Sequence, residues 1–167
     1  SVERLCHVDG IGPGKAVAVA AAFELGKRVA AEDGVGKMPQ MDSPRRVYMN
    51  MLPQLRDIRH EECCVLFLNH ANRLIGKEMI GRGGLESTPV DKRVILRRAL
   101  DRKASGVILV HNHPSGNLTP SQEDIEITDR MSKLFALADM PLLDHIIIGN
   151  GDQYYSFKEN SIMPIHR

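Results

Sequence analysis

Two histidines and one aspartate near the middle of the chain have the residue types and the spacing of a zinc site. His111 and His113 are two residues apart, so their side chains lie on one face where a strand ends. Asp124 follows beyond a loop that contains two prolines and a glycine, so the chain can fold back and offer a third ligand. Two imidazoles, one carboxylate and an open fourth position are typical of catalytic zinc, which activates water at neutral pH.

Other interpretations have less support in the sequence. A His-x-His pair alone usually binds no metal, and only the later aspartate makes the metal interpretation strong. The zinc deaminase pattern needs His-x-Glu and Pro-Cys-x-x-Cys, and the sequence contains neither. A serine hydrolase built on Ser115 would need a Gly-x-Ser-x-Gly turn, which is also missing. His145, beside Asp144 in an apolar run, is interpreted as a hydrogen-bonded core or edge histidine. The remaining histidines are expected at the surface: His7, His60, His70 and His166.

The elements that position these residues are helices and strands in alternation. Helices are predicted over residues 16–31, 44–57, 89–103 and 121–138, with Ser43 and Ser121 as N-caps. Strands are predicted over 63–68, 73–80, 106–110, 144–149 and 153–157, the last two joined by a turn at Asn150-Gly151. The buried face of the third helix is expected to carry Ile95, Leu96, Ala99 and Leu100. Residues 44–167 therefore form an α/β domain, while residues 32–42 have the composition of a linker.

The composition fits a small globular enzyme. The 167 residues are 43% hydrophobic and 26% charged, which is enough apolar surface for a packed core. The net charge of +1 gives no general attraction to nucleic acid or to a membrane. The three cysteines, Cys6, Cys63 and Cys64, lack the spacing of a disulfide framework or a metal knuckle, so a reduced, cytoplasmic location is expected. The apolar run 16–23 is too short to span a membrane.

The pattern His-x-His-Pro, six residues, Ser, two residues, Asp resembles the JAMM motif of the JAB/MPN metalloprotease superfamily at every fixed position. The RadC branch is indicated by Asn112 and Ser115-Gly116 at variable positions within that motif and by two later segments, 144–147 and 155–157. The resemblance implies a cytidine-deaminase-like mixed sheet flanked by helices over residues 43–167. It further implies a zinc-dependent peptidase with His111, His113 and Asp124 as ligands, acting on an unknown protein or peptide.

Two further catalytic roles follow from the resemblance. JAMM enzymes have a glutamate at the start of the first strand of the domain, and Glu61 occupies that position. Glu61 would be the general base, although a shift of one residue in the strand start would exchange it with Glu62. Ser121 is the N-cap of the helix that carries Asp124, and the matching serine of the family also donates a hydrogen bond to the oxyanion.

The first 42 residues suggest a second activity. Gly10, Gly12, Gly14 and Lys15 precede a helix and resemble the turn of a helix-hairpin-helix, whose backbone amides bind DNA phosphate. Ser1 falls inside this motif, so we expect a preceding segment. Residues 1–46 contain seven Lys or Arg against six Asp or Glu, which makes phosphate attraction weak. The main hypothesis is a zinc metallopeptidase, and the alternative is a DNA repair accessory protein with vestigial or structural zinc.

Overall fold

The computed structural model describes residues 2–33, 38–82, 92–149 and 152–164, and its contacts divide the chain into two compact units, Ser1–Met38 and Pro39–Arg167. The first unit contains α1 (Val2–Leu5) and α2 (Pro13–Asp33). The turn between these helices includes Gly10 at φ +81°, a conformation that glycine adopts without steric cost. Among the described residues, no helix has both the length and the apolar character needed to cross a membrane.

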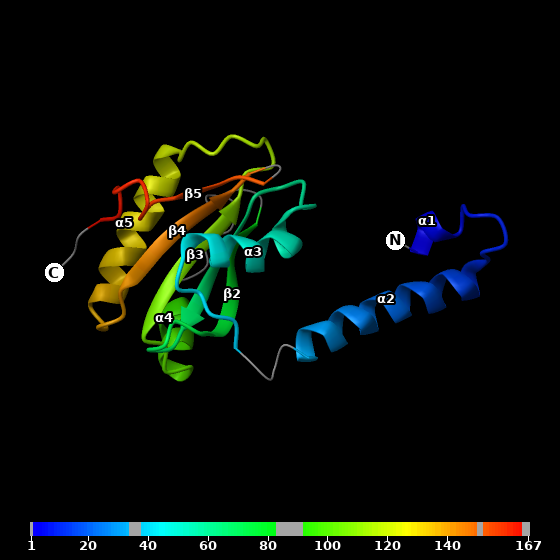
Figure 1. The fold of residues 1–167 in the computed structure, drawn as a ribbon, viewed down its shortest axis with the longest axis horizontal. Helices are drawn as coiled ribbons and strands as arrows, with labels where there is room; N and C mark the ends of the chain where they lie inside the picture. The colour runs from blue at the N-terminus through cyan, green and yellow to red at the C-terminus, as the bar shows by residue number, and fades with distance from the viewer. Residues whose placement is uncertain (1, 34–37, 83–91, 150–151, 165–167) are drawn as a thin grey trace. The chain divides into compact units, whose positions relative to one another are not determined.

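The second unit is built on a five-stranded mixed sheet in the order β2-β1-β3-β4-β5 (Figure 1). Its strands are β1 (Glu62–Leu68), β2 (Leu74–Arg82), β3 (Gly106–Asn112), β4 (Leu142–Ile148) and β5 (Tyr154–Ser156). Neighbouring strands are antiparallel except β3 and β4, which are parallel. A parallel pair requires a crossover, and α5 (Gln122–Ala136) supplies it. The predicted α/β class and mixed sheet are confirmed.

Helices cover both faces of the sheet. α3 (Pro44–Leu55) packs with the even-numbered side chains of β1 and β3, which include Leu66, Ile108 and Val110. α4 (Lys92–Asp101) and α5 pack with the odd-numbered side chains of the same strands, such as Phe67 and Leu109. Since both faces are covered, every residue of β1 and β3 is buried. This explains why the sequence shows continuous apolar runs there instead of alternation.

Local signals define where two helices begin. Ser43 has extended φ and ψ angles, its side chain accepts a hydrogen bond from the Arg46 amide, and Pro44 occupies the first turn of α3. Ser121 and Asp124 form a capping box at the start of α5. Both helices end about two residues before the predicted limits, because helix ends depend on tertiary contacts that periodicity does not report.

Two details of the expected arrangement are wrong. Leu100 is 55% exposed, because the buried stripe of α4 runs through Ile95 and Ala99 and leaves the next position outside it. Residues 39–41 are not part of a free linker. The Pro39 carbonyl accepts from the Leu74 amide, the Met41 amide donates to Asn72, and the Met41 side chain is buried. Residues 89–91 of the predicted third helix and the turn at 150–151 lie outside the described residues.

Candidate metal centre

The three residues that the sequence named as zinc ligands lie together at the carboxyl end of β3. His111 Nε2 is 2.8 Å from His113 Nε2 and 3.1 Å from Asp124 Oδ1, and His113 Nε2 is 3.4 Å from Asp124 Oδ2. His111 and Asp124 are 2% exposed and His113 is 8% exposed. Two imidazole nitrogens and a carboxylate thus converge on one small volume, and all three are donors that zinc accepts.

The loop from β3 to α5 is held by backbone contacts. The His113 amide donates to the Ile148 carbonyl at the end of β4, and the Gly116 amide donates to the His113 carbonyl in a tight turn where Gly116 has φ +80°. Gly149 lies against this loop. A Cβ on Gly149 would meet Leu118 Cδ2 at 2.8 Å and the Gly116 carbonyl oxygen at 3.2 Å. Glycine at this position therefore lets β4 and the ligand loop approach closely.

The capping box of α5 fixes the third ligand. The Asp124 amide donates to Ser121 Oγ at 3.1 Å, and the Ser121 amide donates to Asp124 Oδ2 at 2.7 Å. Burial by itself would raise the pKa of Asp124, but the hydrogen bonds from His111 and His113 outweigh it and hold this pKa well below its ordinary value. The carboxyl group is therefore ionised at neutral pH, which is the form that binds metal.

The second ligand has its ring orientation set by the loop. His113 Nδ1 lies 2.5 Å from the Asn117 carbonyl oxygen, which can only accept, so Nδ1 carries a hydrogen. His113 Nε2 is directed at Asp124, and the hydrogen bond with Asp124 raises the pKa of His113, while burial partly opposes this effect. A metal ion would displace this hydrogen and meet two imidazole nitrogens and a carboxylate in one volume, so the donor set fits zinc.

Strand alternation distinguishes the two glutamates at the start of β1. Cys63 and its odd-numbered neighbours face α5, and Cys63 pairs across the sheet with His111. Glu61 is also odd-numbered, so strand alternation places it on the same face as Cys63, and its side chain is exposed. Its negative charge raises the pKa of His113, although the hydrogen bonds of His113 with Asp124 and Asn117 have larger effects. Glu62 is 5% exposed, lies on the opposite face and contacts His60 through Oε1 at 2.9 Å. Glu61 is thus the glutamate on the side of the metal ligands.

Asn112 connects the metal ligands to the strand that carries Glu61. It lies between His111 and His113, and its side chain Oδ1 accepts from the Glu62 amide at 2.7 Å. Its Nδ2 donates to the His60 carbonyl at 3.0 Å. These two bonds hold the backbone on both sides of Glu61. The pattern of residue types gave no signal for this role, because it depends on the pairing of β1 with β3.

Two buried residues outside the predicted set contact the ligands. His145 Nε2 is 2.7 Å from His111 Nδ1, and His145 Nδ1 is 2.6 Å from Thr128 Oγ1. Burial lowers the pKa of His145 well below its ordinary value, and the nearby His111 adds to this effect, so the ring is neutral. Thr128 follows Asp124 by one helical turn, and this spacing is the signal by which the sequence could have indicated it.

Cys63 is a third buried neighbour of the ligands. Its Sγ and one nitrogen each of His111 and His145 lie within 4.8 Å of one another. Burial raises the pKa of the Cys63 thiol well above its usual value, and the adjacent Cys64 contributes in the same direction. Cys63 is therefore a protonated core thiol.

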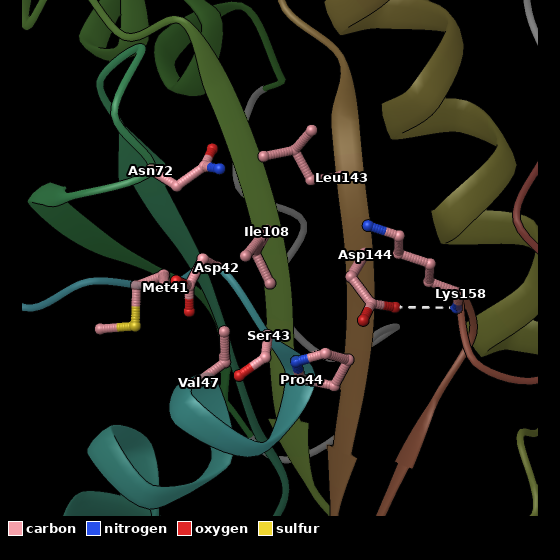
Figure 2. Close-up of a pocket in the computed structure, with 10 residues that line it drawn as sticks. All are labelled: Met41, Asp42, Ser43, Pro44, Val47, Asn72, Ile108, Leu143, Asp144 and Lys158. Atoms are coloured by element: carbon pink, nitrogen blue, oxygen red, sulfur yellow. Dashed lines mark hydrogen bonds between the residues drawn. The ribbon is translucent and has the colours of Figure 1, made fainter.

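A separate pocket lies on the other face of the sheet, at the start of α3 (Figure 2). Its walls include Ser43, Asn72, Ile108 and Asp144, and its volume of about 70 Å³ admits only a few waters. Asp144 is tied into the wall, where Oδ1 accepts from the Lys158 amide at 3.0 Å. Since Ile108 and Asp144 point away from the face that carries His111, the sheet separates this pocket from the metal ligands.

The glycine turn of the first unit adopts a compact local geometry. Lys15 Nζ donates to the Gly10 carbonyl at 3.1 Å, and the Ala16 amide donates to the Gly12 carbonyl as α2 begins. A Cβ on Gly12 or Gly14 would meet no atom within 4 Å. Arg98 of α4 and Arg102, which directly follows this helix, both form ion pairs with Glu78.

The fold and the ligand group together define a JAB-type α/β domain with a candidate metal centre at the end of a central strand. The RadC-like JAB domain family matches residues 41–162, and the chain belongs to this family. Related UPF0758 proteins are 42% identical in Flavobacterium johnsoniae, over 97% of this chain and 70% of the relative, and 40% identical in Porphyromonas gingivalis, over 98% and 75%. A UPF0758 protein of Methanosarcina mazei is 37% identical over 98% of this chain and 70% of its own length.

Proposed function

We propose that this protein is a zinc-dependent hydrolase of the metallopeptidase type that cleaves a peptide or isopeptide bond. The observation that carries the proposal is the convergence of His111, His113 and Asp124, with Glu61 on the same side of the sheet. Zinc held by these three side chains would act as a Lewis acid and lower the pKa of water to about 7.

Two side chains near the candidate ligands support this proposal. Glu61 is exposed at the mouth of the site, so its carboxylate can take a proton from the attacking water and give it to the leaving amine. Ser121 Oγ accepts a hydrogen bond from the Asp124 amide, which leaves its hydroxyl hydrogen available to an oxyanion. Glu61 would thus serve as the base and Ser121 as the oxyanion donor, each beside one member of the ligand group.

The test compares Glu61→Gln with Glu62→Gln, because the two glutamates are neighbours in sequence but lie on opposite faces. Each zinc-loaded protein is incubated with a peptide library of broad composition, and newly formed amino termini are quantified by mass spectrometry. We expect Glu61→Gln to lose about 100-fold or more of the cleavage rate with its zinc retained, because the base is not a ligand. Glu62→Gln should cleave at the original rate. Loss of zinc in Glu61→Gln, or unchanged cleavage, contradicts the assignment.

DNA binding by the first unit is the second candidate. It is supported by the glycine turn at Gly10 that directly precedes the amino end of the 21-residue helix α2. Binding of duplex DNA should weaken with added salt and should weaken further in Lys15→Ala. Affinity that responds to neither change excludes this site.

A further inference from the structure

His111 has a buried partner on each side of its ring. Its Nε2 faces Asp124 and His113, while its Nδ1 lies 2.7 Å from His145 Nε2. His145 Nδ1 in turn lies 2.6 Å from Thr128 Oγ1, and this hydroxyl bonds to the backbone carbonyl of Asp124. His145 and Thr128 are both 0% exposed. These contacts therefore connect the backbone carbonyl of Asp124 to the imidazole of His111 through Thr128 and His145.

When a metal ion occupies His111 Nε2, the hydrogen of this ring is on Nδ1, and the hydrogens in the chain of contacts have one consistent arrangement. Thr128 has a single hydroxyl hydrogen, which goes to the Asp124 carbonyl because a carbonyl can only accept. The Thr128 oxygen must then accept from His145 Nδ1, so the hydrogen of the neutral His145 ring is on Nδ1. His145 Nε2 consequently has a lone pair and accepts from His111 Nδ1–H. The His111 ring is left with its lone pair on Nε2, toward the other ligands.

The His145 ring is held in place by contacts other than these. It stacks on the buried ring of Phe157, with centroids 4.7 Å apart and an angle of 22° between the planes. The backbone amide of His145 donates to Asp144 Oδ1 at 2.7 Å. Because β4 and Phe157 hold the His145 ring, His145 Nε2 is a fixed hydrogen-bond acceptor for His111 Nδ1.

From these contacts we infer that Thr128 and His145 are positioning residues, which hold His111 in the tautomer with hydrogen on Nδ1 and a lone pair on Nε2 for the metal. The inference deepens the proposed function and rests on its metal site. A ligating histidine whose other nitrogen is hydrogen-bonded in this way loses about 10–100-fold in metal affinity when the partner is removed. His145 and Thr128 would therefore determine zinc affinity without contacting zinc.

The experiment uses the full chain and the variants Thr128→Val and Thr128→Ser, with Ser132→Ala as a control. Ser132 is also buried on α5, one turn after Thr128. Two-bond proton–nitrogen NMR spectra of the zinc-loaded proteins, above the ordinary histidine pKa of about 6.5, report which nitrogen of His145 carries hydrogen. Competition with a chelator gives the zinc affinity of each protein.

We expect the unchanged protein, Thr128→Ser and Ser132→Ala to show hydrogen on Nδ1 of His145 and equal zinc affinity. In Thr128→Val the Nδ1–H of His145 has no acceptor, and a hydrogen on Nε2 would instead oppose the Nδ1–H of His111. This variant should therefore bind zinc about 10-fold or more weakly. If Thr128→Ser keeps the zinc affinity that Thr128→Val loses, the hydroxyl group is responsible and the packing of the threonine methyl group is not.

Two results would overturn the inference. The first is hydrogen on Nε2 of His145 in the zinc-loaded unchanged protein, which can be measured even if Thr128→Val does not fold. The second is a folded Thr128→Val protein with the original zinc affinity. Failure of the proposed function looks different: the zinc affinities follow the prediction, but no variant and no unchanged protein cleaves a peptide.

Discussion

At the scale of single residues, the candidate centre depends on where charges and hydrogens are placed. Asp124 is almost fully buried and still ionised, because His111 and His113 stabilise its charge more than burial destabilises it. His113 is oriented by the Asn117 carbonyl and His111 by His145. The Asp124 carboxylate is oriented by the Ser121 amide. Each candidate ligand thus has a hydrogen-bond partner that orients its side chain, as is typical of metal sites in proteins.

The low pKa of Asp124 predicts a specific dependence of stability on pH. A carboxyl whose pKa is lower in the folded state stabilises that state above its unfolded pKa of about 3.9, and the contribution is lost as pH falls through the folded value. Urea unfolding of the metal-free protein should therefore give a free energy that falls on acidification below about pH 4. Asp124→Asn should show a smaller fall.

The control for this measurement is Asp42→Asn, which changes an exposed carboxylate paired with Arg46. Its pH profile should follow that of the unchanged protein closely, because exposed ion pairs contribute little. If Asp124→Asn and Asp42→Asn have the same profile, Asp124 is not stabilised in the way that its contacts indicate.

At the scale of elements, the approach of β4 to the ligand loop predicts the effect of Gly149→Ala. The added Cβ would meet Leu118, whose side chain can move, and the Gly116 carbonyl oxygen, which is backbone and cannot move without shifting the loop. We expect a loss of about 1–3 kcal/mol in the free energy of unfolding and weaker zinc binding. Gly26→Ala is the control: a Cβ there meets nothing, and alanine inside α2 should add up to about 1 kcal/mol. A neutral Gly149→Ala would mean that the loop is not closely packed.

The bond between Asn112 and β1 makes a second prediction at this scale. Asn112→Ala leaves the buried Glu62 amide without its acceptor, so the free energy of unfolding should fall by about 1–3 kcal/mol. Hydrogen exchange at the Glu62 amide should accelerate, while zinc affinity should change little because no ligand is altered. Asn69→Ala removes similar amide contacts in an exposed turn and should cost less. An equal loss of unfolding free energy in Asn112→Ala and Asn69→Ala would show that the buried hydrogen bonds of Asn112 stabilise the fold no more than exposed ones.

The sequence predicted the elements better than the contacts between them. Spacing named His111, His113 and Asp124, and the caps at Ser43 and Ser121 are confirmed, because such signals lie within a few residues of one another. The triad of Thr128, His145 and His111 joins α5, β4 and β3, so its contacts depend on a pairing that local patterns do not encode. The choice between Glu61 and Glu62 likewise needed the true start of β1.

At the scale of the whole molecule, the family match and the packed core both lie in the second unit. Residues 41–162 match the RadC-like JAB domain family. Among the described residues, every buried hydrophobic side chain except Ala16 lies in the second unit. We therefore expect a chain that begins at Pro39 to fold and to bind zinc with the affinity of the full protein. Circular dichroism during heating and chelator competition test this. A shortened chain that does not unfold cooperatively would show that the first unit is part of the fold.

His111, His113 and Asp124 are proposed to hold a catalytic zinc ion. The most direct measurement is the zinc content of the purified full chain by elemental analysis, after zinc has been supplied at neutral pH and excess has been removed, beside the same measurement on Asp124→Ala. About one zinc per chain, lost or greatly reduced in the variant, is the predicted result. A full chain without zinc, or a variant that keeps it, would contradict the claim.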